Sequence, residues 1–150
     1  MPEQKKQIDL IKINNQHIKW LLIAGRVCFV SIFILTSFDQ FKAQSIAFAA
    51  FKGVPFASIV VPFSGIMEIV GALSIVLGYR SRIGALLIMI FLIPVTFTFH
   101  QFWTIPDQMA KQMDMINFFK NISILGGAFI IAYFGSGELS LDNMQRKSKN

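Results

Sequence analysis

The order of apolar and polar positions divides this chain into four long apolar stretches separated by polar connections. The stretches are Trp20 to Phe38, Ala57 to Tyr79, Ile83 to Trp103 and about Met115 to Phe134. A helix needs about 20 mainly apolar residues to cross the hydrocarbon core of a bilayer. The pattern therefore predicts an all-α membrane protein, built as a bundle of four transmembrane helices.

The first connection carries a helix signal of its own. Residues Ala43 to Phe51 place apolar side chains at helical spacing, and Gly53 followed by Pro55 gives the usual order of helix stop signals. We expect a short interfacial helix between the first and second transmembrane helices. The next connection, Gly78 to Arg82, is so short that the second and third transmembrane helices must be antiparallel neighbours.

Small residues mark the faces on which these two helices should touch. The second transmembrane helix contains Gly65, Gly71, Ala72 and Gly78, and the third opens with Gly84 and Ala85. In lipid, small residues allow two helix backbones to approach closely. We interpret them as packing positions and not as a binding site.

Composition and charge agree with a membrane protein and indicate its orientation. Hydrophobic residues make up 54% of the 150 residues, charged residues only 15%, and the net charge is +6. Nine basic residues lie before the first helix, in the short turn or after the fourth helix: Lys5, Lys6, Lys12, Lys19, Arg80, Arg82, Arg146, Lys147 and Lys149. By the positive-inside rule, this distribution places both termini in the cytoplasm. The basic charge is thus a topology signal and does not indicate nucleic-acid binding.

The same distribution suggests how the chain is divided. We expect a cytoplasmic basic N-terminus over residues 1–19, a transmembrane domain over residues 20–135 and a cytoplasmic polar tail over residues 136–150. The lipid bilayer is the one partner that composition alone predicts.

Cysteine and histidine usage restricts the chemistry. Cys28 is the only cysteine, so this chain alone has neither an internal disulfide nor a dithiol redox pair. The only histidines are His17 and His100, and no spacing of histidine, cysteine and carboxylate resembles a zinc or haem site. We therefore predict no metal site and no intrinsic cofactor.

Two ionisable residues lie inside the predicted membrane helices. Arg26 lies about two turns from the cytoplasmic end of the first, and Glu68 about three turns from the same end of the second. Their backbones then differ in depth by roughly 7 Å, which an arginine side chain can bridge. We predict a buried Arg26–Glu68 ion pair that fixes helix register. The alternative is that Glu68 carries protons.

A second group of polar residues should gather at the outer end of the bundle. His100 and Trp103 close the third helix, Lys120 and Asn121 lie near the start of the fourth, and the first helix delivers Asp39 to the same side. We take these five as a candidate ligand or proton site. In the simpler interpretation, Trp103 anchors the protein in the aromatic belt and Lys120 flanks the bilayer.

The ordered motifs resemble the DoxX family of small bacterial membrane proteins. They are Arg26, Phe38-Asp-Gln-Phe-Lys42, Gly53-Val-Pro55, Glu68, Leu77-Gly78, Phe99-His-Gln-Phe-Trp103, Asn117-Phe-Phe-Lys-Asn121, Gly126-Gly127 and Leu139-Ser-Leu-Asp142. Thr36-Ser37 departs from the glycine usual at that place in the family. The resemblance implies a four-helix bundle in the bacterial cytoplasmic (inner) membrane and a link to redox physiology, since relatives form the membrane subunit of a thiosulfate:quinone oxidoreductase.

Three functions follow as hypotheses. The first is an accessory subunit of a membrane redox or quinone-linked system, in which His100 and Lys120 bind a quinone oxygen and nearby aromatic rings pack on the quinone. The second is a non-catalytic scaffold that recruits a soluble redox enzyme. The third is a small-solute or proton pathway through Glu68, for which four helices are few unless the protein forms a homo-oligomer. Any oxidoreductase activity would depend on an external cofactor or a partner chain.

Overall fold

The chain folds entirely into helices and connections over the residues described. The structure is a computed structural model that describes the backbone of residues 2–148 and the side chains of residues 19–148. Its elements are α1 (Pro2–Ser37), η1 (Phe38–Phe41), α2 (Ala43–Phe51), α3 (Ala57–Leu77), α4 (Ser81–Phe99), η2 (Phe102–Thr104), α5 (Gln108–Phe134) and α6 (Leu141–Ser148). The predicted short helix from Ala43 to Phe51 is present as α2.

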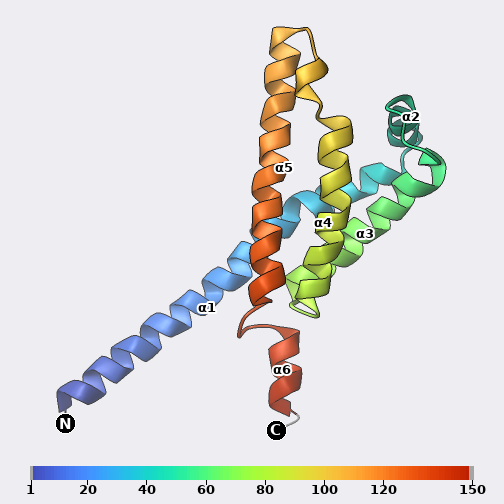
Figure 1. Ribbon diagram of the computed structural model, residues 1–150. Coiled ribbons are helices and arrows are strands. Elements are labelled where there is room, and N and C mark those ends of the chain that lie inside the picture. The colour runs from blue at the N-terminus through green and yellow to red at the C-terminus, as the bar shows by residue number, and fades with distance from the viewer. Residues whose placement is uncertain (1, 149–150) are drawn as a thin grey trace.

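Four of these segments are long and apolar enough to cross a membrane: Lys19–Phe41, Ala57–Leu77, Ser81–Thr104 and Gln108–Phe134. The prediction of an all-α, multi-pass membrane protein is therefore confirmed. Helix α3 packs against α1 and α4, and α4 packs in turn against α5. Figure 1 shows α4 and α5 side by side, with α1 and α3 crossing them at a steep tilt. The turn between α3 and α4 lies at the same end as α6, and α2 and the α4–α5 connection lie at the other end (Figure 1).

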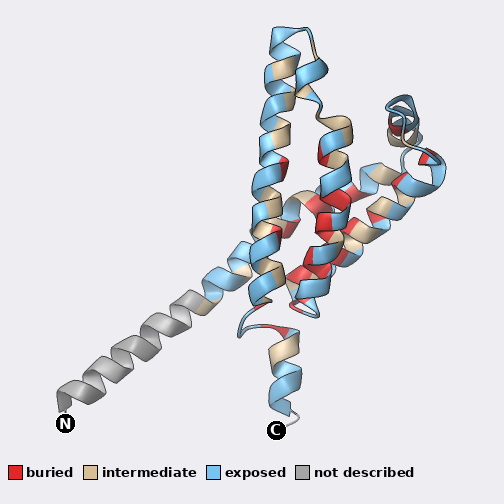
Figure 2. Cartoon of the chain, in the orientation of Figure 1, coloured by how far each residue is buried: buried red, intermediate tan, exposed pale blue. Residues whose placement is uncertain are grey.

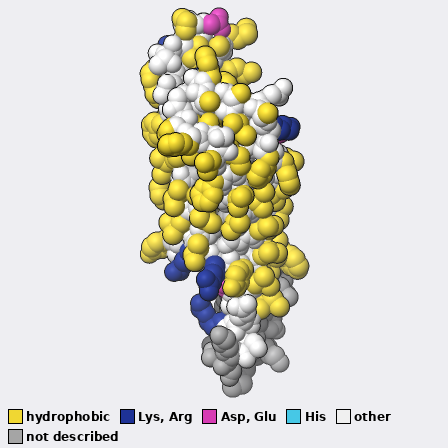
Figure 3. Space-filling view, turned by 90° about the vertical axis from the view of Figure 1, so that its right-hand side faces the viewer, with side chains coloured by type: hydrophobic (Ala, Val, Ile, Leu, Met, Phe, Trp, Pro, Cys, Tyr) yellow, Lys and Arg dark blue, Asp and Glu magenta, His cyan; other side chains and the backbone are white. Residues whose placement is uncertain are grey.

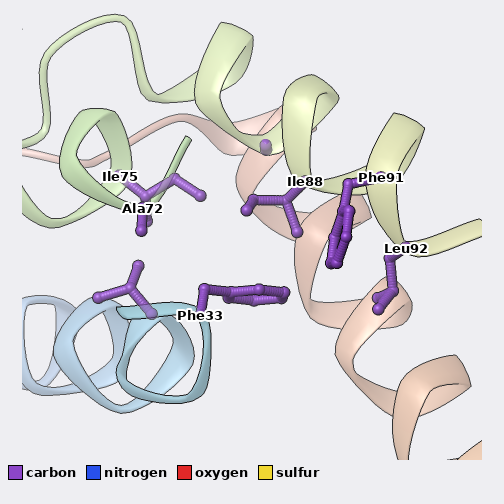
Figure 4. Packing of buried hydrophobic residues seen from close by; sticks show 8 residues of the cluster. Phe33, Ala72, Ile75, Ile88, Phe91 and Leu92 are labelled. Atoms are coloured by element: carbon purple, nitrogen blue, oxygen red, sulfur yellow. The ribbon is translucent and has the colours of Figure 1, made fainter. Parts of the chain in front are cut away.

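The core lies where α1, α3 and α4 meet (Figure 2). Figure 4 shows Phe33 of α1 facing Ala72 and Ile75 of α3 and Ile88 and Phe91 of α4. Ala72, Ile75 and Ile88 have no exposed surface. The outer surface is also apolar, and hydrophobic side chains cover most of the face in Figure 3. A soluble domain would not leave such a surface exposed, whereas a bilayer covers it.

The contact between α3 and α4 depends on glycine, as the sequence predicts. A Cβ atom on Gly71 would lie 3.0 Å from the carbonyl oxygen of Gly84. A Cβ on Gly84 would lie 2.7 Å from the side chain of Ser74 and 2.8 Å from the carbonyl oxygen of Gly71. The two backbones therefore approach to a distance that no larger residue allows.

Helix α5 begins at Gln108, seven residues before the predicted start at Met115. Asp107 caps it, since its Oδ1 accepts a hydrogen bond from the Ala110 amide at 2.8 Å. Helix α1 likewise extends beyond its apolar stretch. Hydropathy finds the part of a helix that crosses hydrocarbon, whereas caps and helix propensity decide how far it continues into the polar region.

Candidate functional site

A cavity of about 600 Å³ opens between α2, α3 and α4. We call it the α2 groove. Its walls are mostly apolar and include Phe48, Val61, Met67, Phe91 and Phe99. The polar side chains that line it are Gln40, Ser45, Ser64, Thr98 and His100. Such a lining, apolar with a few hydrogen-bonding groups, is typical of ligand sites.

Packing of the short helix α2 forms one wall of the α2 groove. Ala49 is buried against Val61 of α3, and Phe99 of α4 packs on the same cluster. The rings of Phe48 and Phe99 stack with their centroids 5.8 Å apart. Helix α2 therefore covers the groove from the end of the bundle opposite α6.

Glu68 is buried directly beside this groove, with 1% of its surface exposed. Its Oε1 accepts a hydrogen bond from Thr36 Oγ1 at 3.1 Å, and its Oε2 accepts one from Gln40 Nε2 at 3.4 Å. Thr36 and Gln40 lie one helical turn apart and present their donors on one face. Because Gln40 also lines the α2 groove, it connects the buried carboxyl group to the groove wall.

Arg26 contacts the C-terminal part of the chain and not Glu68. Its Nη2 donates to the carbonyl oxygen of Leu139 at 2.5 Å, and its Nε donates to that of Leu22 at 3.4 Å. Among the side chains described, no salt bridge joins Arg26 to Glu68. Thr36, which binds Glu68, lies ten residues beyond Arg26, or about 15 Å along the helix. Arg26 lies instead against Gly78, at the end of α3 and ten residues from Glu68. Counting from the start of the apolar stretch therefore misplaces Arg26 relative to α3, because α1 passes the end of α3 at Arg26 and not at Trp20.

The five residues of the predicted outer site do not form one cluster. His100 Nδ1 lies 2.8 Å from Asp114 Oδ1, and both side chains are mostly buried. Lys120 Nζ instead donates to Asn117 Oδ1 at 3.0 Å. Within residues 19–148, no hydrogen bond connects His100 to Lys120 or to Asn121, which is buried in α5. His100 is the only one of the five that lines the α2 groove.

The remaining two candidates lie on the surface. Asp39 forms a salt bridge with Lys42 at 2.6 Å, with both side chains more than half exposed. Trp103 is also half-exposed and packs edge-to-face on Phe102 and Phe118, with centroid distances of 5.1 and 5.9 Å. This position agrees with the simpler interpretation of Trp103 as an aromatic anchor.

Several site residues escaped the sequence argument. The spacing of Thr36 and Gln40, four residues apart at the end of an apolar helix, was a usable signal for a shared partner. Asp114 lies just before the predicted start of the fourth membrane helix, yet it is nearly two turns into the capped helix α5, from where an acid can reach a histidine on the preceding helix. In the part of the chain with described side chains, no group of three histidine, cysteine or acidic residues could hold a metal ion, and Cys28 is exposed.

The segment after α5, residues 135–148, is held against the membrane helices by several bonds. We call it the C-terminal segment. The amide of Asp142 donates to the Gly78 carbonyl oxygen at 3.1 Å, and its carboxylate accepts from the Arg80 amide at 2.9 Å. The hydroxyls of Ser81 and Ser136 lie 2.6 Å apart. Together with the bond from Arg26 to Leu139, these contacts join the segment to α1 and to the α3–α4 turn.

Comparisons with known proteins give a consistent family. The family model described as SURF4 family matches residues 5–148. The Escherichia coli inner membrane protein YphA is 32% identical over 124 residues, covering 81% of this chain and 88% of YphA. The yeast ER-derived vesicles protein ERV29 is 23% identical over 138 residues, which is 92% of this chain but 38% of ERV29. The Drosophila melanogaster Surfeit locus protein 4 homolog is 29% identical over 86 residues, covering 55% of this chain and 32% of the homolog. No solved structure matches.

These matches overturn the resemblance to the DoxX family, which is wrong. The function inferred from that resemblance, a redox or quinone-linked accessory role with a quinone or a soluble redox enzyme as partner, is wrong with it. Short motifs at the ends of four apolar helices led to the error, because helix ends in any such bundle favour aromatic, basic and amide residues. A match over nearly the whole chain discriminates between families where those motifs do not.

Proposed function

Because this chain belongs to the SURF4 family, we propose that it is an inner-membrane binding protein that holds an apolar polypeptide segment in the α2 groove. The name of its relative YphA, an inner membrane protein, supports the location. The excess of basic residues before α1, in the α3–α4 turn and in the C-terminal segment supports cytoplasmic termini. In that orientation, the α2 groove faces the outer side of the membrane.

The observation that carries the proposal is the composition of the α2 groove. Its volume of about 600 Å³ lies within the usual range of ligand sites. Apolar walls bind apolar side chains. The hydroxyls of Ser45 and Thr98 can donate to or accept from a peptide backbone, and Ser64, whose hydroxyl donates to the Val61 carbonyl oxygen at 2.7 Å, can accept from a backbone amide. An acyl chain would contact the walls but offer these hydroxyls no hydrogen-bond partner. This difference favours a polypeptide segment over a lipid tail.

His100 helps to build the groove. Its Nδ1 is hydrogen-bonded to Asp114, and this contact fixes the end of α4 against α5. Since the imidazole ring has a second nitrogen, Nε2 remains available to hydrogen-bond a bound segment. The present chain spans about a third of ERV29 and of the Drosophila relative.

Photo-crosslinking tests the proposal. A synthetic hexapeptide of leucine and valine with a central benzophenone side chain is added to the protein in lipid nanodiscs, irradiated, and the attachment site is found by mass spectrometry. We expect saturable labelling of Met67, because benzophenone attacks methionine readily and Met67 lines the α2 groove. The substitution Ser64→Trp fills the groove and should abolish this labelling.

Ile66→Trp is the matched control, since Ile66 lies on the same helix with half of its surface exposed and does not line the groove. It should leave labelling unchanged. Equal labelling of both variants would contradict a site in the α2 groove. Labelling of Met67 by a phospholipid with a benzophenone on its acyl chain, but not by the peptide, would identify the occupant as lipid and contradict the polypeptide proposal.

A further inference from the structure

A second cavity lies at the opposite end of the bundle, between the α3–α4 turn and the C-terminal segment. Its volume is about 640 Å³, and three arginines line it: Arg80 in the turn, Arg82 in α4 and Arg146 in α6. We call it the arginine pocket. Helices separated by more than 50 residues in the sequence thus direct their cations to one place.

The acidic residues around the arginine pocket have other partners. Glu138 forms a salt bridge with Lys19 at 2.5 Å, and the hydrogen bond from Lys19 lowers the pKa of Glu138. Asp142 accepts a hydrogen bond from the Arg80 amide. Among the described side chains, none of the three pocket arginines forms a salt bridge. Their positive charge is therefore available to a ligand.

A buried donor below the arginine pocket also lacks a partner. Arg26 is 6% exposed, and its Nη1 makes no hydrogen bond to any described atom. It lies against Gly78, where an added Cβ would collide with Nη1 and with the Cβ atoms of Ser136 and Ser140. Both serines line the pocket. Leaving a buried charged donor without a partner is costly, so an acceptor is expected nearby.

The position of the pocket indicates where the acceptor comes from. Figure 3 shows Lys and Arg side chains gathered at one edge of the hydrophobic surface. Two apolar residues, Ile83 and Phe134, line the same pocket and are half or more exposed. A ligand there meets arginines on one side and lipid-facing apolar surface on the other. This combination matches a phospholipid, whose phosphate is joined to acyl chains.

We propose that the arginine pocket binds the phosphate of an anionic phospholipid from the same leaflet. Arg82 and Arg146 bind the phosphate oxygens, since the planar guanidinium group matches phosphate in a bidentate geometry. Ile83 and Phe134 contact the start of the acyl chains. The bound lipid then joins α4 to α6 and holds the C-terminal segment against the membrane.

Native mass spectrometry of the protein released from mixed micelles tests the site. Phosphatidylglycerol and phosphatidylcholine are supplied in equal amounts, and retained lipid is counted per protein. We expect one phosphatidylglycerol to be retained in preference to phosphatidylcholine. The double substitution R82Q/R146Q should reduce this preference about 30-fold, because each arginine near the anionic surface contributes about a factor of five.

The matched control is K52Q/K111Q, which removes two charges at the other end of the bundle and should keep the preference. Thermal unfolding followed by tryptophan fluorescence confirms that both variants are folded. A third arm adds inorganic phosphate at millimolar concentration. Displacement of lipid by inorganic phosphate at low concentration would identify a free phosphate as ligand and overturn the lipid assignment. Equal loss of preference in both double variants, or in neither, would overturn the site itself.

Discussion

The substitution Gly84→Ala provides a direct test of how α3 and α4 are held together. The new Cβ would lie 2.7 Å from Ser74 and 2.8 Å from the Gly71 carbonyl oxygen, whereas carbon atoms in contact normally lie about 3.5–4.0 Å apart. The helices must therefore separate by about 1 Å. Each atom pair in contact then loses a quarter to a half of an attraction of about 0.1–0.2 kcal/mol.

This loss of van der Waals attraction is repeated over many atom pairs, because fully buried residues lie in the contact between α3 and α4, including Ala72, Ile75 and Ile88. Overpacking of this kind costs about 1–3 kcal/mol. The gain in helix propensity from glycine to alanine, about 1 kcal/mol, offsets part of it. We expect a net destabilisation of about 1 kcal/mol, which changes the folding equilibrium constant about fivefold.

Unfolding by SDS, followed through the fluorescence of Trp20 and Trp103, measures this change. Gly126→Ala is the control, because apart from its chain neighbours and the backbone of its own helix no atom lies within 4 Å of its added Cβ. In this variant only the helix propensity changes, so the protein should be as stable as the wild type or slightly more stable. If Gly84→Ala and Gly126→Ala unfold at the same SDS fraction, the close approach of α3 and α4 does not limit stability and the reasoning is wrong.

The buried polar contacts give three further expectations. Arg26→Leu should speed hydrogen exchange in the C-terminal segment roughly 10–100-fold, because a hydrogen bond to a charged donor contributes about 1.5–3 kcal/mol; unchanged exchange would contradict the anchor. Glu68→Gln should keep near-normal stability in SDS, whereas Glu68→Leu leaves Gln40 without its acceptor and should cost about 1–3 kcal/mol; equal costs would argue against the network. Because Lys19 lowers the pKa of Glu138, their ion pair stabilises the segment above the ordinary carboxyl pKa of about 4.3 and is lost as the pH falls through the lowered value. Pepsin should therefore cut the C-terminal segment faster below about pH 4 in the wild type, and Glu138→Gln should remove this pH dependence.

The positions of the membrane helices could be predicted because hydrocarbon imposes one strong rule on length and composition. The same rule showed that Arg26 and Glu68 are buried. It could not show their partners, since partner choice depends on tilt and rotation that hydropathy does not determine. Glu68 meets neutral donors of α1, and Arg26 meets the backbone at Leu139. Neither arrangement has a signature in residue spacing between helices.

The α2 groove also could not be predicted from the sequence. Apart from His100, its polar side chains are serine, threonine and glutamine, which are too common at helix ends to indicate a site. Charged and aromatic residues were predicted to form a site, yet Asp39 and Trp103 lie on the surface. The fold could therefore be predicted from the sequence, whereas the site required the packing of α2 on α3 and α4, which only the structure provides.

The bond from Arg26 to Leu139 has a consequence for the order in which the protein is made. Its two residues are 113 positions apart in the chain. A ribosome adds about 5–20 residues per second, so Leu139 is synthesised on the order of ten seconds after Arg26. During that time its guanidinium lacks the partner that it has in the finished protein. A segment synthesised later thus completes the surroundings of α1, because only a chain that reaches Leu139 gives Arg26 this partner.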